Sequence, residues 1–74
     1  MDPQAAWTNL LDAYEAHDSE TACEAAEALR RWIGRGGFPP KTLDRTMTDA
    51  WHRAATLAAC QFILDESQRH GSMD

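Results

Sequence analysis

The chain has 74 residues, of which 12 are acidic and 7 are basic, so its net charge is −5. A chain of this length forms at most one small domain with a modest core, and we expect a single helical domain over residues 1–74 that gains further stability by oligomerisation. The acidic balance excludes nucleic acid as a default partner, because duplex binding depends on neutralising phosphates.

Two short helices are predicted in the first half of the chain. Asp2 suits the N-cap of the first helix and Pro3 its first position, and this helix ends near His17. Asp18 and Ser19 provide the cap of the second helix. The apolar stripe of the first helix consists of Trp7, Leu10, Leu11 and Tyr14, and that of the second consists of Ala22, Ala25, Ala26, Leu29, Trp32 and Ile33.

A longer third helix is predicted from residue 40 or 41 to about residue 68, with residues 69–74 as a flexible tail. Thr46 and Thr48 are β-branched and could admit a kink or a new N-cap, so the continuity of this helix is open. One continuous helix is favoured because the apolar stripe keeps its phase through the threonines. The stripe consists of Leu43, Met47, Ala50, Trp51, Ala54, Leu57, Ala58 and Leu64, with Phe62 at its flank.

The predicted helix lengths favour a dimer. A helix of about 28 residues is about 42 Å long, whereas its two predecessors reach only about 22 Å, so they cannot cover its stripe from end to end. A second copy of the chain related by a two-fold axis would cover the remainder. The predicted fold is therefore an all-α, three-helix protomer, made of a helical hairpin and a long third helix, in a dimeric helical bundle. The predicted interface consists of Trp51, Leu57, Phe62 and Leu64.

The segment RRWIGRGGFPP, residues 30–40, interrupts the acidic sequence with arginines and glycines. Its glycines follow a helix rather than open one, which is typical of a helix C-cap and not of a phosphate-binding loop. We favour a turn in which Phe38 folds back onto Trp32 or Ile33. The alternative is a site for an anionic partner, consisting of Arg30, Arg31, Arg35, Lys41 and Arg45.

Residues that could support metal binding or catalysis are scattered along the chain. No two of His17, Cys23, His52, Cys60 and His70 stand at the spacing of a metal-ligand pair. A core this small seldom provides a catalytic cleft. We therefore expect no metal, no cofactor and no catalytic residues.

Residues 7–29, WTNLLDAYEAHDSETACEAAEAL, resemble the helical hairpin of a tetratricopeptide repeat. Trp7, Leu10 and Tyr14 match the spacing of that family's first helix. The resemblance implies packing of a helix pair and protein binding. A single repeat has no concave groove, so the family's peptide-binding function is not carried over. The whole chain looks like the small uncharacterised helical proteins of bacterial genomes, which implies a type of fold and no activity.

The predicted function is that of a non-catalytic protein–protein interaction module that acts as a homodimer. The alternative is a small regulator that binds nucleic acid or another anionic partner through residues 30–45. We expect the partner to be a second copy of the chain, with another protein as a further candidate and nucleic acid disfavoured. No apolar run reaches the roughly 20 residues that span a bilayer, and no signal peptide is evident, so we expect a cytoplasmic location with free thiols.

Overall fold

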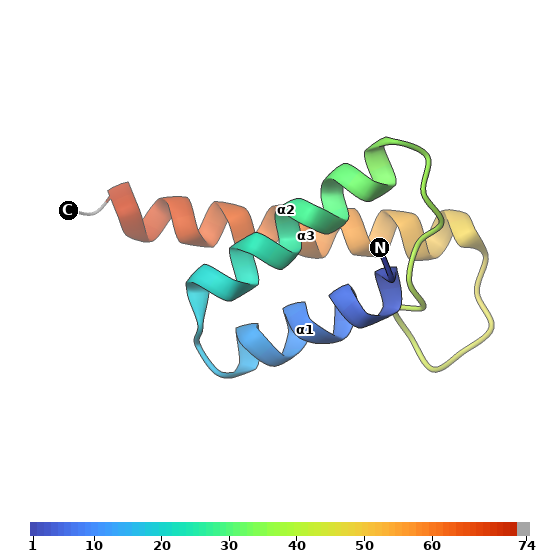
Figure 1. Ribbon diagram of the computed structural model, residues 1–74, viewed down its shortest axis with the longest axis horizontal. Coiled ribbons are helices and arrows are strands. Elements are labelled where there is room, and N and C mark those ends of the chain that lie inside the picture. Colours follow the sequence, from blue (N-terminus) through green and yellow to red (C-terminus); the bar gives the residue numbers. More distant parts are fainter. Residues whose placement is uncertain (73–74) are drawn as a thin grey trace.

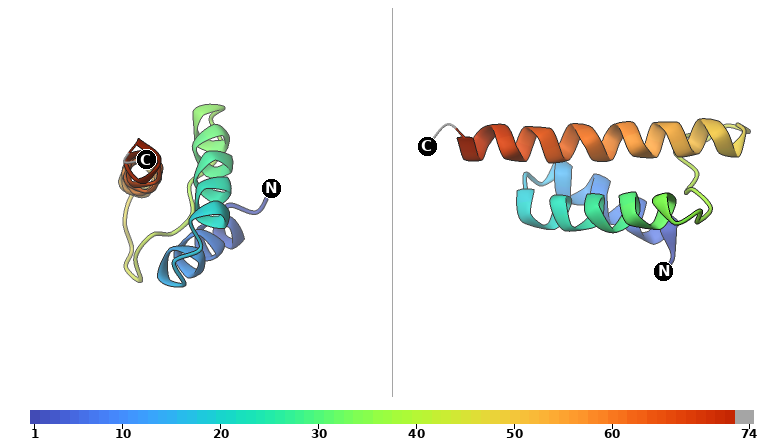
Figure 2. Two further views of the ribbon diagram at one scale, coloured as in Figure 1. Left: turned by 90° about the vertical axis from the view of Figure 1, so that its left-hand side faces the viewer. Right: turned by 90° about the horizontal axis from the view of Figure 1, so that it is seen from above.

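The computed structural model describes residues 1–72 as three helices joined by two connections (Figure 1). They are α1 (Pro3–Glu15), α2 (Ser19–Gly34) and α3 (Asp49–Ser72). No strand occurs within these residues, so the predicted all-α class is confirmed. The hairpin of α1 and α2 packs against α3 mainly through α2. Viewed along α3, both α1 and α2 lie to one side of it (Figure 2, left). Viewed from above, the C-terminal turns of α3 project beyond both helices (Figure 2, right).

The two predicted caps of the hairpin are present. The Asp2 carboxylate accepts hydrogen bonds from the backbone N–H groups of Gln4 and Ala5, and Pro3 takes the first helical position. The Asp18 carboxylate caps α2 by accepting from the Thr21 N–H, and the bonds from Thr21 lower the pKa of Asp18 below its usual range. These caps satisfy backbone donors that have no partner within the helix, which explains where both helices begin.

The predicted start of the third helix at residue 40 or 41 is wrong, because α3 begins at Asp49. Thr48 is its N-cap: the Thr48 hydroxyl accepts from the Trp51 N–H at 3.2 Å. Residues 35–48 instead form a strap that returns from α2 to α3. The Lys41 N–H donates to the Gln4 side chain at 2.9 Å, and the Thr42 N–H donates to Nδ1 of His52 at 3.0 Å. These side chains satisfy backbone groups that a continuous helix would otherwise have paired internally.

The corrected length of α3 still exceeds that of its neighbours. With 24 residues against 13 in α1 and 16 in α2, it is about 36 Å long, compared with about 20 and about 24 Å. The helix continues through residues 69–72, which belong to the predicted flexible tail. Residues 73–74 lie outside the described part of the chain.

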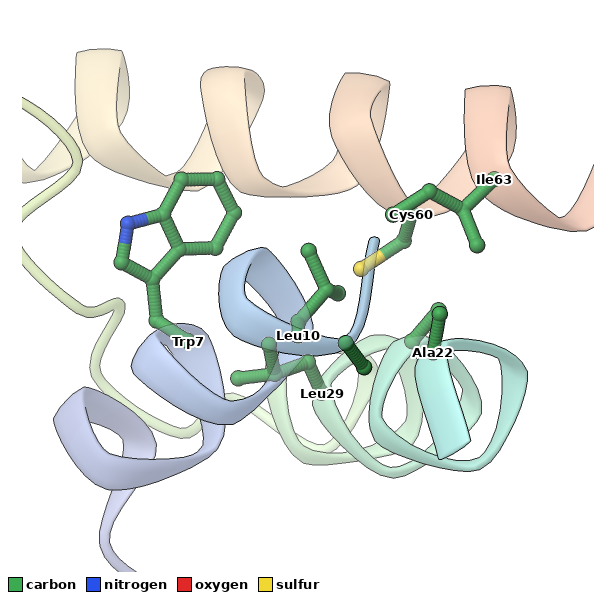
Figure 3. Packing of buried hydrophobic residues seen from close by; sticks show 8 residues of the cluster. Trp7, Leu10, Ala22, Leu29, Cys60 and Ile63 are labelled. Carbon is green, nitrogen blue, oxygen red and sulfur yellow. The ribbon is translucent and has the colours of Figure 1, made fainter. Parts of the chain in front are cut away.

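The core lies where the three helices meet (Figure 3). Leu10 of α1 and Leu29 of α2 are fully buried at its centre, and α3 contributes Cys60, whose sulfur points toward the hairpin. Small side chains at Ala22 and Ala26 let the helices approach closely. The buried cluster consists of Trp7, Leu10, Ala13, Ala22, Ala26, Leu29, Cys60 and Ile63.

The face that α3 buries differs from the predicted stripe. Its most buried residues are His52, Thr56, Cys60 and Ile63, at intervals of four, four and three residues. The Thr56 hydroxyl donates to the His52 carbonyl oxygen at 2.7 Å, and Nδ1 of His52 accepts from the strap. Because these polar atoms have partners, their burial carries little penalty. The most apolar face of α3 is therefore not the one that turns inward.

The turn after α2 is built around Trp32, as the sequence predicts. Phe38 packs edge-on against the Trp32 ring at a centroid distance of 5.8 Å, and the Trp32 Nε1–H donates to the Phe38 carbonyl at 2.8 Å. Gly36 adopts a φ of 87°, which favours glycine. A Cβ atom at Gly37 would overlap the indole ring of Trp32.

Replacing Gly37 by alanine is expected to lower the free energy of unfolding by about 1–3 kcal/mol, because the added methyl group forces the Trp32 ring off its hydrogen bond. Gly34→Ala is the matched control: apart from its chain neighbours and the backbone of its own helix, nothing would lie within 4 Å of its Cβ, and alanine suits a helix better than glycine. Urea denaturation of both variants measures the difference. Equal stabilities would contradict this account of the turn.

Candidate interaction surface

One side of α3 presents apolar side chains to solvent. Trp51 is 47% exposed and Phe62 is 53% exposed, while Ala54 and Ala58 are exposed and Ala55 is half-buried between them. Their spacing places all five on one face of the helix. We call Trp51, Ala54, Ala55, Ala58 and Phe62 the outer face.

The outer face stands in contrast to the buried face of the same helix. α3 turns His52 and Thr56 into the core, yet leaves two aromatic side chains in water. Buried polar groups and exposed large apolar groups are the informative exceptions to the usual distribution of residues. A monomer that maximised its own apolar burial would place the aromatic rings inside. The packing of a single chain therefore does not explain why these aromatic side chains lie on the outer face.

The apolar surface continues from α3 onto α1. Phe62 packs edge-on against Tyr14, with ring centroids 5.9 Å apart and planes inclined by 66°. The Tyr14 hydroxyl donates a hydrogen bond to a carboxylate oxygen of Glu66, 3.5 Å away. Tyr14 and the neighbouring Leu11 are both largely exposed. The Phe62 end of the outer face is thus the wider end.

The four predicted interface residues fall in two groups. Trp51 and Phe62 belong to the outer face and are among the most exposed large apolar side chains of the described residues. Leu57 and Leu64 are half-buried, and Leu64 packs against the core of its own chain. The aromatic pair is therefore available to a partner, whereas Leu64 is already partly used.

The cations on and immediately after α2 have local partners or neighbours. Arg31 bonds to Glu27 four residues earlier, with an N–O distance of 3.1 Å. The guanidinium of Arg35 lies over the Trp32 ring at 5.9 Å, at a distance typical of a cation–π contact. Arg30 is exposed on the same helix.

The other two cations of the predicted anionic-partner site lie further along the strap, of which Arg35 is the first residue. Lys41 and Arg45 line a broad hollow of about 590 Å³, which Asp44 and Asp49 also line. The five cations are thus divided between the C-terminal half of α2 and the strap, and acidic groups share the hollow. This arrangement gives an anion no preformed, uniformly positive site.

A second hollow, of about 330 Å³, lies between the α1–α2 turn and α3, and its lining includes Tyr14, His17, Cys23 and Glu66. Among the side chains that the structure describes, no three His, Cys, Asp or Glu groups lie together in a way that could hold a metal ion.

Both thiols are free. Burial raises the pKa of Cys60 to about 11, with a smaller opposing influence from the positive charge of Arg30. This thiol is therefore protonated at neutral pH and behaves as a small apolar side chain.

The apolar stripe read from the sequence includes Ala54 and Ala58, but the predicted interface omits them, and Ala55 is in neither set. Trp51, Ala55, Ala58 and Phe62 are separated by four, three and four residues, which is the spacing of a coiled-coil seam. This spacing can be read from the sequence, but the predicted interface instead includes Leu57 and Leu64, which lie outside the outer face. Conversely, no apolar pattern reveals the inward position of His52 and Thr56.

None of the helices within residues 1–72 is both long and apolar enough to cross a membrane. Comparison with protein-family models, curated proteins and solved structures finds no match to this chain. The resemblance of residues 7–29 to a tetratricopeptide hairpin stays a prediction, and function must be argued from the surface itself.

Proposed function

We propose that this protein is a non-catalytic protein–protein interaction module that acts as a homodimer through the outer face of α3. The observation that carries the proposal is the exposure of Trp51 and Phe62 on a helix that buries histidine and threonine instead. Aromatic residues are enriched at the centres of protein interfaces. A second copy would remove from water the surface that the first copy leaves uncovered.

The exposed apolar area would contribute substantially to a dimer. An aromatic side chain carries about 150–250 Å² of surface, and Trp51 and Phe62 are each about half exposed. These two residues then offer about 200 Å² per chain, or about 400 Å² per dimer, worth about 10 kcal/mol before the cost of association. Leu11, Tyr14 and the alanines add to this area. The total is comparable with the roughly 4–15 kcal/mol that association costs, so this area offsets a large part of that cost.

The thermal midpoint of unfolding tests this proposal through its dependence on protein concentration. If folding and dimerisation are linked, the midpoint should rise by several degrees between about 1 and about 100 µM chain, because mass action favours the dimer. Circular dichroism at 222 nm, in cells of matched path length, gives the measurement. An unchanged midpoint over this range would contradict a dimer that contributes to stability.

A further inference from the structure

We propose that the two copies dock with their α3 helices antiparallel, about a two-fold axis that passes between residues 56 and 57. This inference rests on the proposed homodimer and specifies its geometry. Trp51 and Phe62 are equidistant from that point of the helix, and so are Ala55 and Ala58. The axis therefore places Trp51 against the partner's Phe62, and Ala55 against the partner's Ala58.

The sizes of the side chains fit this arrangement. Alanine at positions 55 and 58 allows the two helix axes to approach at the short end of the usual range of about 8–10 Å. The large rings of Trp51 and Phe62 stand one helical turn or more beyond the alanines, on either side. Each indole would then pack against a phenyl ring at both ends of a narrow alanine seam. The pairing is self-complementary, as a two-fold interface requires.

Charge favours the same orientation. Asp65 lies three residues beyond Phe62 and continues the seam. Asp65 accepts a hydrogen bond from Gln61 of its own chain at 2.8 Å. In an antiparallel pair it meets the start of the partner's α3, where the positive end of the helix dipole acts on it against the negative charge of Asp49 in the same turn. In a parallel pair each Asp65 would face the partner's Asp65, and like charges at facing seam positions repel.

The seam is accessible in a single chain. Both hairpin helices lie to one side of α3 (Figure 2), and Trp51, Ala58 and Phe62 are exposed. Phe62 is also braced by Tyr14, which holds its ring on the side of the helix toward α1. The partner thus meets a surface whose widest part is ordered before association.

A double-mutant cycle tests the orientation. The dissociation constants of Trp51→Ala, Phe62→Ala and the double variant are measured by sedimentation equilibrium, with circular dichroism to confirm that each variant stays helical. Within one chain the two residues are eleven positions, or about 16 Å, apart, too far to interact directly. Across the antiparallel interface they touch twice per dimer. The double variant should therefore bind at least about fivefold more tightly than the product of the single effects predicts.

A distance measurement gives an independent readout. With Cys23→Ser removing the half-buried thiol and Cys60 protected by burial, a spin label at Gln68→Cys reports the separation of the two copies. The antiparallel pairing places the labelled backbone positions about 35 Å apart along the helix axes. A separation below about 20 Å, or strictly multiplicative effects in the cycle, would overturn the orientation while leaving the dimer intact. A native chain that stays monomeric would instead overturn the proposed function itself.

Discussion

Replacing Ala58 by aspartate is expected to dissociate the proposed dimer while leaving the three helices in place. Ala58 is exposed in the single chain, so the change costs the monomer only the difference in helix propensity, up to about 0.7 kcal/mol. In the proposed dimer it would bury two unpaired carboxylates at the centre of the seam. Burying an unpaired charge in an interface costs about 2–5 kcal/mol, so the dissociation constant should rise by at least about 100-fold.

Ala5→Asp is the matched control for this variant. Ala5 is also an exposed helical alanine, but it lies in the first turn of α1, where a carboxylate is favourable. It adds the same charge and should leave the dissociation constant unchanged. Size-exclusion chromatography with light scattering, together with circular dichroism, reports association and helicity. If Ala58→Asp dimerises as tightly as the control, the outer face is not the interface.

Replacing Leu29 by alanine is expected to have the largest effect on folding. Leu29 of α2 is fully buried at the centre of the core, next to Leu10 of α1 (Figure 3). Removing a buried leucine side chain costs about 2–5 kcal/mol, depending on how far the cavity collapses. A domain of this size has little stability in excess of that loss. We therefore expect the variant to be mostly unfolded at 25 °C.

Leu43→Ala controls for the loss of a leucine as such. Leu43 lies on the strap and is 45% exposed, so its replacement should change the free energy of unfolding by less than about 0.5 kcal/mol. Urea titrations at one chain concentration compare the two variants. Similar losses of stability in both would show that the core is not centred where the structure places it.

The hairpin was predictable because its signals are local. Asp2, Pro3 and Asp18 act within a few residues of their own position, and so does the turn in which Phe38 packs on Trp32. The strap was not predictable for the opposite reason. Leu43 and Met47 continue a helical spacing, but the backbone of this segment is bonded to Gln4 and His52, which are distant in sequence. No pattern along the strap reveals these partners.

The inward face of α3 was misread because hydrophobicity alone does not decide burial. Thr56 bonds its own helix and His52 accepts from the strap, so both can be buried at little cost. Their burial turns the aromatic residues outward. Trp51, Ala58 and Phe62 stand on or beside the stripe read from the sequence, but their exposure to solvent is known only once the buried face is known.

The central claim is that a second copy covers the outer face of α3. Sedimentation equilibrium of the native chain at tens of micromolar tests this claim most directly. The expected result is a single species of about twice the 8.3 kDa chain mass, with Ala58→Asp sedimenting as a monomer under the same conditions. A native chain that sediments at 8.3 kDa, with its helices intact, would contradict the account.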